Sequence, residues 1–179
     1  APTLAAWISL LAAIPEAKLL LHAHGGQHRQ RAWDLCARQG VSPERLTFTD
    51  RVPLAEYFRH YHRVDLALDP FPYGGGTTTC DALWMGVPVV SLAGPTAVGR
   101  AGLSILSNVG LADFVAHDCQ EYVGIARQLA GDLPRLSLLR ATLRDRMQSS
   151  PLMDARRFAH HVETAYRAMW QRRCAAQGE

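Results

Sequence analysis

The residues best suited to chemistry lie in a glycine- and threonine-rich run, where residues 69–84 read DPFPYGGGTTTCDALW. Glycines let the main chain approach a ligand closely, because they carry no Cβ. The threonines add hydroxyl donors at the predicted start of a helix, where free N–H groups and the helix dipole favour an anion such as a pyrophosphate. The predicted ligand-binding residues of this turn are Gly75, Gly76, Thr77, Thr78 and Thr79.

Asp81 follows in the same predicted helix and is a poor partner for a phosphate. It is better placed to accept hydrogen bonds from a ribose diol beside the helix. Two structural alternatives stay open: Thr78 and Asp81 have the spacing of a capping box, and the glycines can form a simple tight turn. The run is not a Walker A loop, since no lysine follows the glycines, and it lacks the G-x-G-x-x-G pattern of redox Rossmann domains. These residues therefore predict an anion or nucleotide site without identifying the ligand.

The elements that must position this run alternate between strand and helix. The periodicity of the apolar residues, together with capping and helix-breaking residues, predicts four helices and four strands. The helices span residues 4–14 (with Thr3 as N-cap), 27–38, 53–61 and 78–85, and the strands span residues 18–23, 45–49, 64–68 and 87–92. Such alternation predicts right-handed β-α-β units and an α/β fold with a doubly wound, Rossmann-like parallel sheet. The glycine-rich run follows the carboxyl end of a predicted strand, which is the edge where open α/β sheets bind ligands.

The rest of the chain is predicted to be mostly helical. Further helices are expected over residues 101–107, 118–130, 133–147 and 153–173, and Asp118 with Glu121 forms a capping-box pair. No internal repeat or linker is visible, so residues 1–179 are expected to form a single domain. The chain opens on a helix without an initiator methionine, and we expect it to be truncated at its N-terminus.

Composition narrows the class of protein. Apolar residues make up 48% of the 179 residues and charged residues 20%, as in ordinary globular proteins. The net charge of +3 is scattered, which argues against a nucleic-acid partner, and no apolar run is long enough to suggest a membrane partner. The four cysteines form no C-x-x-C pair, so we expect a reducing, cytoplasmic location. His22, His24 and His28 invite a metal site, but their spacing matches no zinc motif and none is predicted.

Residues 69–90 closely resemble the donor-binding signature of the protein O-GlcNAc transferase and Spindly family. The resemblance continues through residues 94–100, 108–111, 149–151 and 166–170. It implies a GT-B architecture, in which two Rossmann-like domains face a cleft, and it makes this chain the C-terminal, donor-binding domain.

The resemblance also implies roles for individual residues. Thr77 and Thr78 match the pair that contacts the diphosphate, Asp81 matches the acid that holds the ribose, and Val52 and Arg59 lie in the segment bordering the nucleobase. Two departures leave the donor open between UDP-GlcNAc and GDP-fucose. Animal O-GlcNAc transferases have histidine where this chain has Gly76, and plant Spindly has glutamate at the Asp81 position.

The function implied by the resemblance is inverting transfer of GlcNAc from UDP-GlcNAc to serine or threonine of proteins, without a metal cofactor. The alternatives are O-fucosyl transfer from GDP-fucose and a non-catalytic nucleotide-sugar-binding module. The family's phosphate-stabilising lysine, its N-terminal catalytic domain and its acceptor-selecting tetratricopeptide repeats have no counterpart here. The catalytic residues are therefore expected outside this chain, and the chain alone is expected to be inactive.

Overall fold

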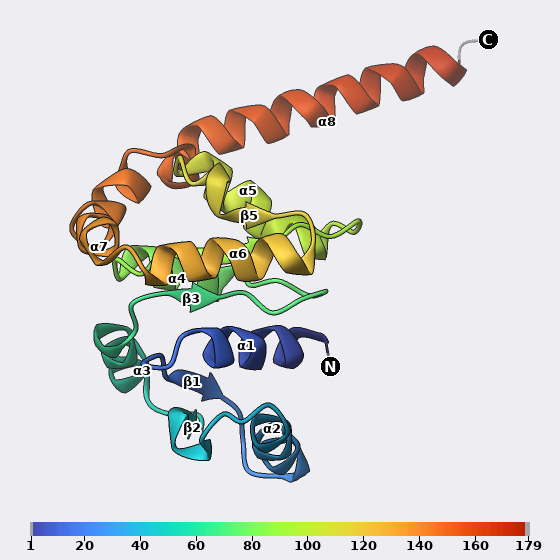
Figure 1. Cartoon of the computed structure of the whole chain (residues 1–179). Coiled ribbons are helices and arrows are strands. Elements are labelled where there is room, and N and C mark those ends of the chain that lie inside the picture. Colours follow the sequence, from blue (N-terminus) through green and yellow to red (C-terminus); the bar gives the residue numbers. More distant parts are fainter. Residues whose placement is uncertain (1, 178–179) are drawn as a thin grey trace.

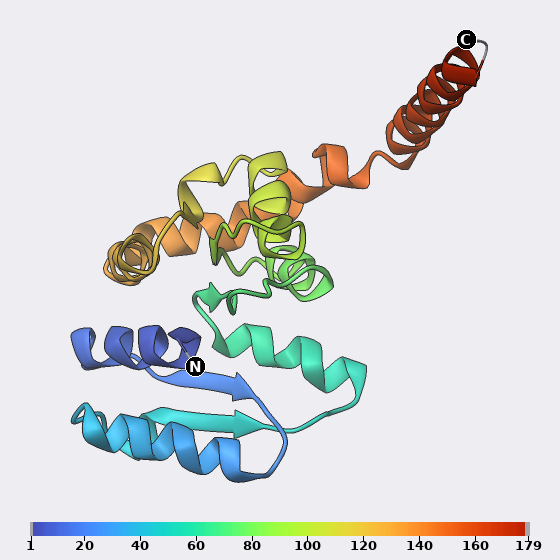
Figure 2. The same cartoon turned by 90° about the vertical axis from the view of Figure 1, so that its right-hand side faces the viewer.

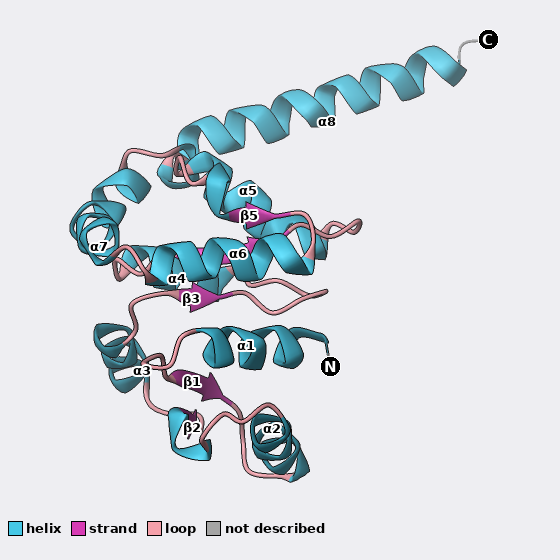
Figure 3. Cartoon of the chain, in the orientation of Figure 1, coloured by secondary structure: helices cyan, strands magenta, loops and turns pink. Residues whose placement is uncertain are grey.

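Parallel strands flanked by helices make up the computed structural model, which describes residues 2–177 (Figure 1). Strands β1 (Leu19–His22) and β2 (Leu46–Thr49) pair in parallel, in register Leu19 opposite Leu46. Strands β3 (Ala67–Leu68), β4 (Val89–Leu92) and β5 (Val115–Ala116) form a second parallel sheet with β4 in the centre. The predicted α/β class with parallel strands is confirmed, although the strands form two separate sheets (Figure 3).

Eight α-helices connect and cover these strands in the described part of the chain. They are α1 (Pro2–Ala13), α2 (Gln27–Arg38), α3 (Leu54–His60), α4 (Thr77–Trp84), α5 (Ala101–Asn108), α6 (Cys119–Ala130), α7 (Leu133–Gln148) and α8 (Ala155–Gln177). Helices α4, α5 and α6 pack on β4, and α7 packs on α4 and α6. Helix α1 packs on both α2 and α6, so it joins the β1–β2 half to the β3–β5 half.

Two hydrophobic clusters follow this division. The larger surrounds β4 and includes Leu83 of α4 and Tyr122 of α6, both fully buried. The smaller lies between α1, α2 and the first sheet and includes Ile8, Cys36 and Leu46. The glycine-rich run is therefore supported by the larger cluster.

Several predicted boundaries are wrong for identifiable reasons. Thr3 does not cap α1; it lies inside the helix, and its hydroxyl hydrogen-bonds both the N–H and the carbonyl of Phe71. The strand expected over residues 64–68 is limited to Ala67–Leu68, because Val64 instead ends the 3-10 turn Tyr61–Arg63. Strand β5 was not predicted, since two residues show no period.

The capping-box prediction for α6 is confirmed. The Asp118 carboxylate accepts a hydrogen bond from the Glu121 N–H at 2.8 Å, and the Glu121 carboxylate accepts one from the His117 N–H. The first interaction satisfies an N–H group of the first turn that would otherwise be free, whereas the second holds the N–H of the residue before the N-cap.

Helix α8 projects away from the rest of the molecule (Figures 1 and 2). It extends four residues beyond the predicted end and exposes Phe158, Tyr166, Met169 and Trp170. Among the described residues, no helix combines the length and apolar character needed to cross a bilayer.

Candidate functional site

The candidate site is the start of helix α4. Strand β3 ends at Leu68, and residues 69–76 lead from its carboxyl end into the helix. Gly76 is the N-cap, and no side chain caps the helix. The capping box considered for Thr78 and Asp81 does not form. The first-turn N–H groups therefore lack a side-chain capping partner at the positive end of the helix dipole, which suits an anion.

The three threonines of this turn have different environments. Thr77 and Thr78 are exposed, as is Gly76. Thr79 is only 1% exposed, and its hydroxyl donates a hydrogen bond to the Asp69 carboxylate at 3.0 Å. Thr79 was predicted as a ligand-binding residue, but its hydroxyl is buried and already hydrogen-bonded within the protein. Gly75 is also half-buried against Asp69 and Thr79, so it forms the support of the turn.

Asp81 connects α4 to α3. Its Oδ2 accepts a hydrogen bond from the Tyr57 hydroxyl at 2.9 Å, and the Tyr57 and Tyr61 hydroxyls lie 2.6 Å apart. The Tyr61 hydroxyl also reaches the Thr78 carbonyl at 3.4 Å. Burial, followed by the hydrogen bond with Tyr61, raises the pKa of Tyr57, so the phenol stays protonated and donates. The pair of tyrosines fixes the position of the carboxylate.

Val52 and Arg59 lie on either side of this contact in the sequence. Val52 is half-buried just before α3, and Arg59 is exposed in the last turn of α3. The link between Tyr57 and Asp81 brings α3 beside α4, whereas Arg59, two residues after Tyr57, lies on the opposite side of α3 from this contact. Tyr57 and Tyr61 were not singled out from the sequence, although their i,i+4 spacing places them on one helix face.

His24 of the histidine cluster faces a carboxylate that an arginine also contacts. His24 lies 3.5 Å from the Asp50 carboxylate, which also pairs with Arg29 at 2.8 Å. In residues 2–177, no group of three or more histidine, cysteine, aspartate or glutamate side chains is arranged to hold a metal ion.

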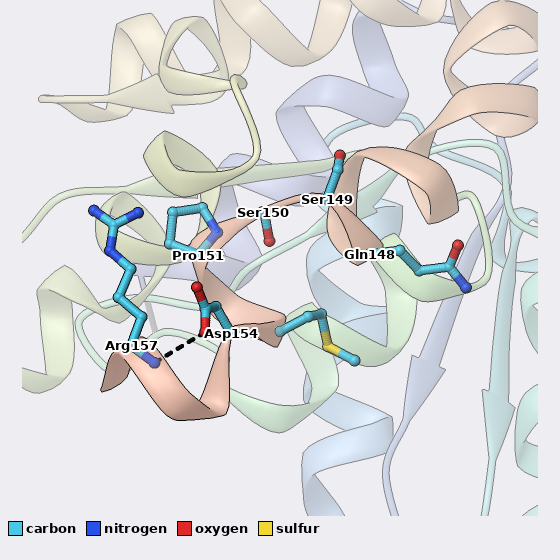
Figure 4. A pocket seen from close by; sticks show the side chains of 7 residues that line it. Gln148, Ser149, Ser150, Pro151, Asp154 and Arg157 are labelled. Carbon is cyan, nitrogen blue, oxygen red and sulfur yellow. Dashed lines mark hydrogen bonds between the residues drawn. The ribbon is translucent and has the colours of Figure 1, made fainter. Parts of the chain in front are cut away.

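A separate hollow of about 400 Å³ lies where α7 meets α8. Figure 4 shows its side chains, which come from Gln148, Ser149, Ser150, Pro151, Met153, Asp154 and Arg157. Its polar groups are partly used internally. The Ser150 hydroxyl donates to the Met147 carbonyl at 2.7 Å, and the Asp154 carboxylate accepts from the Arg157 N–H at 2.9 Å. No residue of the glycine-rich run lines it.

Parallel strands whose carboxyl end leads through glycines into an uncapped helix are typical of Rossmann-like domains. The family comparison agrees: residues 1–162 match the model described as glycosyl transferase family 41. The chain belongs to this family.

Relatives of known name cover nearly the whole chain. A probable UDP-N-acetylglucosamine–peptide N-acetylglucosaminyltransferase SPINDLY from Petunia hybrida is 39% identical over 175 residues, which is 94% of this chain and 18% of the relative. A UDP-N-acetylglucosamine–peptide N-acetylglucosaminyltransferase from Caenorhabditis elegans is 32% identical over 95% of this chain and 15% of the relative. The structure of a mutant O-GlcNAc transferase from Thermobaculum terrenum superposes with a TM-score of 0.88 and 38% identity. The superposition covers 97% of this chain and 34% of that one. The chain thus spans about a fifth or less of the curated relatives.

Proposed function

We propose that this chain is the donor-binding half of an inverting glycosyltransferase that moves GlcNAc from UDP-GlcNAc to serine or threonine of proteins. The observation that carries the proposal is the exposed trio Gly76, Thr77 and Thr78 at the uncapped start of α4. Family membership adds the reaction class.

The chemical task at this turn is to stabilise negative charge. When the sugar leaves the donor, charge develops on the departing diphosphate. Main-chain N–H groups held at a helix start, together with the Thr77 and Thr78 hydroxyls, are already oriented toward such charge and need no reorganisation. This arrangement favours the transition state over the bound donor.

Asp81 supplies the proposed ribose contact. It lies four residues after Thr77 and three after Thr78, so the three side chains share one side of α4. Tyr57 engages Oδ2, and we assign the second carboxylate oxygen to the ribose hydroxyls. Val52 and Arg59 then border the nucleobase from the α3 side.

The printed names of the relatives favour UDP-GlcNAc as the donor. The Petunia hybrida and Caenorhabditis elegans proteins are both named for transfer from UDP-N-acetylglucosamine to peptide. The surface that binds the acceptor protein and the other half of the active site would belong to regions of the relatives that this chain does not span. We further propose a cytoplasmic location, because all four cysteines are free thiols in the described structure.

Thermal denaturation of the complete protein with candidate donors tests the proposal. UDP-GlcNAc is expected to raise the melting temperature, since a ligand that binds only the native state at a hundredfold excess over Kd adds about 2.7 kcal/mol. Uridine, which lacks the diphosphate, is expected to have a much smaller effect. A larger rise in melting temperature with GDP-fucose than with UDP-GlcNAc would make GDP-fucose the assigned donor. No shift with either nucleotide sugar would contradict donor binding. Binding without glycosyl transfer would favour a sensor module.

A further inference from the structure

The Asp69 carboxyl group, immediately after β3, is buried in an unusual setting. The residue is only 6% exposed, and its Oδ1 accepts a hydrogen bond from the Thr79 hydroxyl. Oδ2 is buried and, among the described residues, makes no hydrogen bond of normal geometry, although the Ser91 hydroxyl lies beside the carboxyl group. A buried polar group of this kind is energetically costly, so its other contacts must hold it in place.

Glycines enclose this carboxyl group on two sides. A Cβ on Gly75 would lie 2.7 Å from Oδ1 and 2.3 Å from the Thr79 hydroxyl. A Cβ on Gly102, in the first turn of α5, would lie 3.0 Å from Oδ2. The glycine-rich turn and α5 therefore close directly onto Asp69. Burial raises the pKa of this carboxyl group, against the lowering effects of the Thr79 and Ser91 hydroxyls and the Gly75 N–H.

The main chain of Asp69 is fixed to the larger core. Its N–H donates to the Val90 carbonyl of β4 at 2.9 Å. Its carbonyl accepts from the buried Tyr122 hydroxyl at 2.9 Å, and that hydroxyl accepts from the Trp7 indole N–H at 2.9 Å. The main chain of Asp69 is thus held by the sheet and the core, and its side chain holds the turn that leads to Thr79, ten residues further along the chain.

We propose that Asp69 is a positioning residue of the donor site, whose carboxyl group holds Gly75 and Thr79 so that Gly76, Thr77 and Thr78 face the diphosphate. This inference rests on the proposed function. Asp69 itself is too deeply buried to touch the donor. It acts by fixing the inner side of the turn whose outer side binds.

Calorimetric titration of the full chain with UDP tests this role, with the melting temperature of each variant recorded in parallel. Asp69→Ala is expected to raise the Kd for UDP about tenfold, equivalent to about 1.4 kcal/mol. Asp69→Asn keeps a carbonyl oxygen that can accept the Thr79 hydrogen bond, so it is expected to retain Kd within about threefold, at most about the value of one hydrogen bond. A role in folding alone would lower the melting temperature while leaving Kd unchanged in the folded protein, and that result would overturn the proposal.

Thr79 provides an independent test if Asp69→Ala fails to fold. Thr79→Val removes the hydroxyl and is expected to raise Kd, whereas Thr79→Ser keeps it and is expected to restore binding. Equal Kd values for Val and Ser at this position would overturn the inference. If the unmodified chain binds no UDP, the proposed function fails and the inference fails with it. If the unmodified chain binds UDP and the Asp69 and Thr79 variants bind equally well, only the inference fails.

Discussion

The central strand β4 of the second sheet and strand β1 of the first differ in how deeply they are buried. Val89 and Val90 in β4 are 1% and 0% exposed, whereas β1 has half-buried leucines and ends on the exposed His22. Helix α4 packs against β4, whereas α3 follows the sheet of β1 and β2 in the chain. The proposed diphosphate end of the site therefore has the firmer support. The proposed nucleobase end depends on a hydrogen bond between Tyr57 and Asp81 to hold its place.

The largest expected effect concerns the two cores. Leu83→Ala, at a fully buried position of α4, is expected to lower the free energy of unfolding by about 4 kcal/mol. This value is within the range for well-packed leucines whose surroundings cannot relax into the cavity left by the mutation. Leu46→Ala, in the smaller cluster, is expected to cost about 2 kcal/mol, because shallower surroundings can relax into the cavity. Urea denaturation measures both free energies of unfolding. An equal or larger loss for Leu46→Ala would remove the distinction between the regions.

A second effect compares a tight glycine with an open one. Gly75→Ala places a Cβ 2.3 Å from the Thr79 hydroxyl, so we expect a loss of about 1 to 3 kcal/mol together with loss of UDP binding. Gly124→Ala is the matched control, since no atom lies within 4 Å of its Cβ on α6. Alanine is more stable than glycine in a helix interior, so we expect Gly124→Ala to raise the free energy of unfolding by about 0.5 to 1 kcal/mol and to leave UDP binding unchanged. Reversed signs in thermal denaturation would contradict the packing around Asp69.

A smaller effect concerns the proposed ribose contact. Asp81→Ala is expected to weaken UDP binding about tenfold, or about 1.4 kcal/mol. It is also expected to lower stability by about 1 kcal/mol, because the Tyr57 hydroxyl loses its acceptor. Asp145→Ala, at an exposed position of α7, serves as the control and should leave Kd unchanged. Unchanged affinity of Asp81→Ala by calorimetry would count against the ribose role.

The smallest effect tests the link between the two regions. Tyr57→Phe keeps the ring but removes the hydroxyl that orients Asp81, and we expect about threefold weaker UDP binding, near the value of one hydrogen bond. Tyr166→Phe on α8 removes an exposed hydroxyl and should have no effect. A Tyr57→Phe loss as large as that of Asp81→Ala would mean that Tyr57 contacts the nucleotide itself.

The parts of this account that the sequence could predict are those with strong local signals. Helix 27–38 and the Asp118–Glu121 cap follow from period and capping chemistry, and the structure has both. The glycine-rich run also marked the turn before α4. The inward role of Thr79 was not predictable, because three consecutive threonines look alike until Asp69 is placed beneath one of them. Tyr57 was missed for the same reason, since its partner Asp81 lies 24 residues away.

The central claim is that the outer face of the α4 start binds the donor diphosphate. Amide NMR spectra of the chain titrated with UDP test it most directly. The account predicts that the largest chemical-shift changes fall on the N–H groups of Gly76, Thr77 and Thr78. Changes concentrated instead at residues 148–157, around the hollow where α7 meets α8, would contradict it.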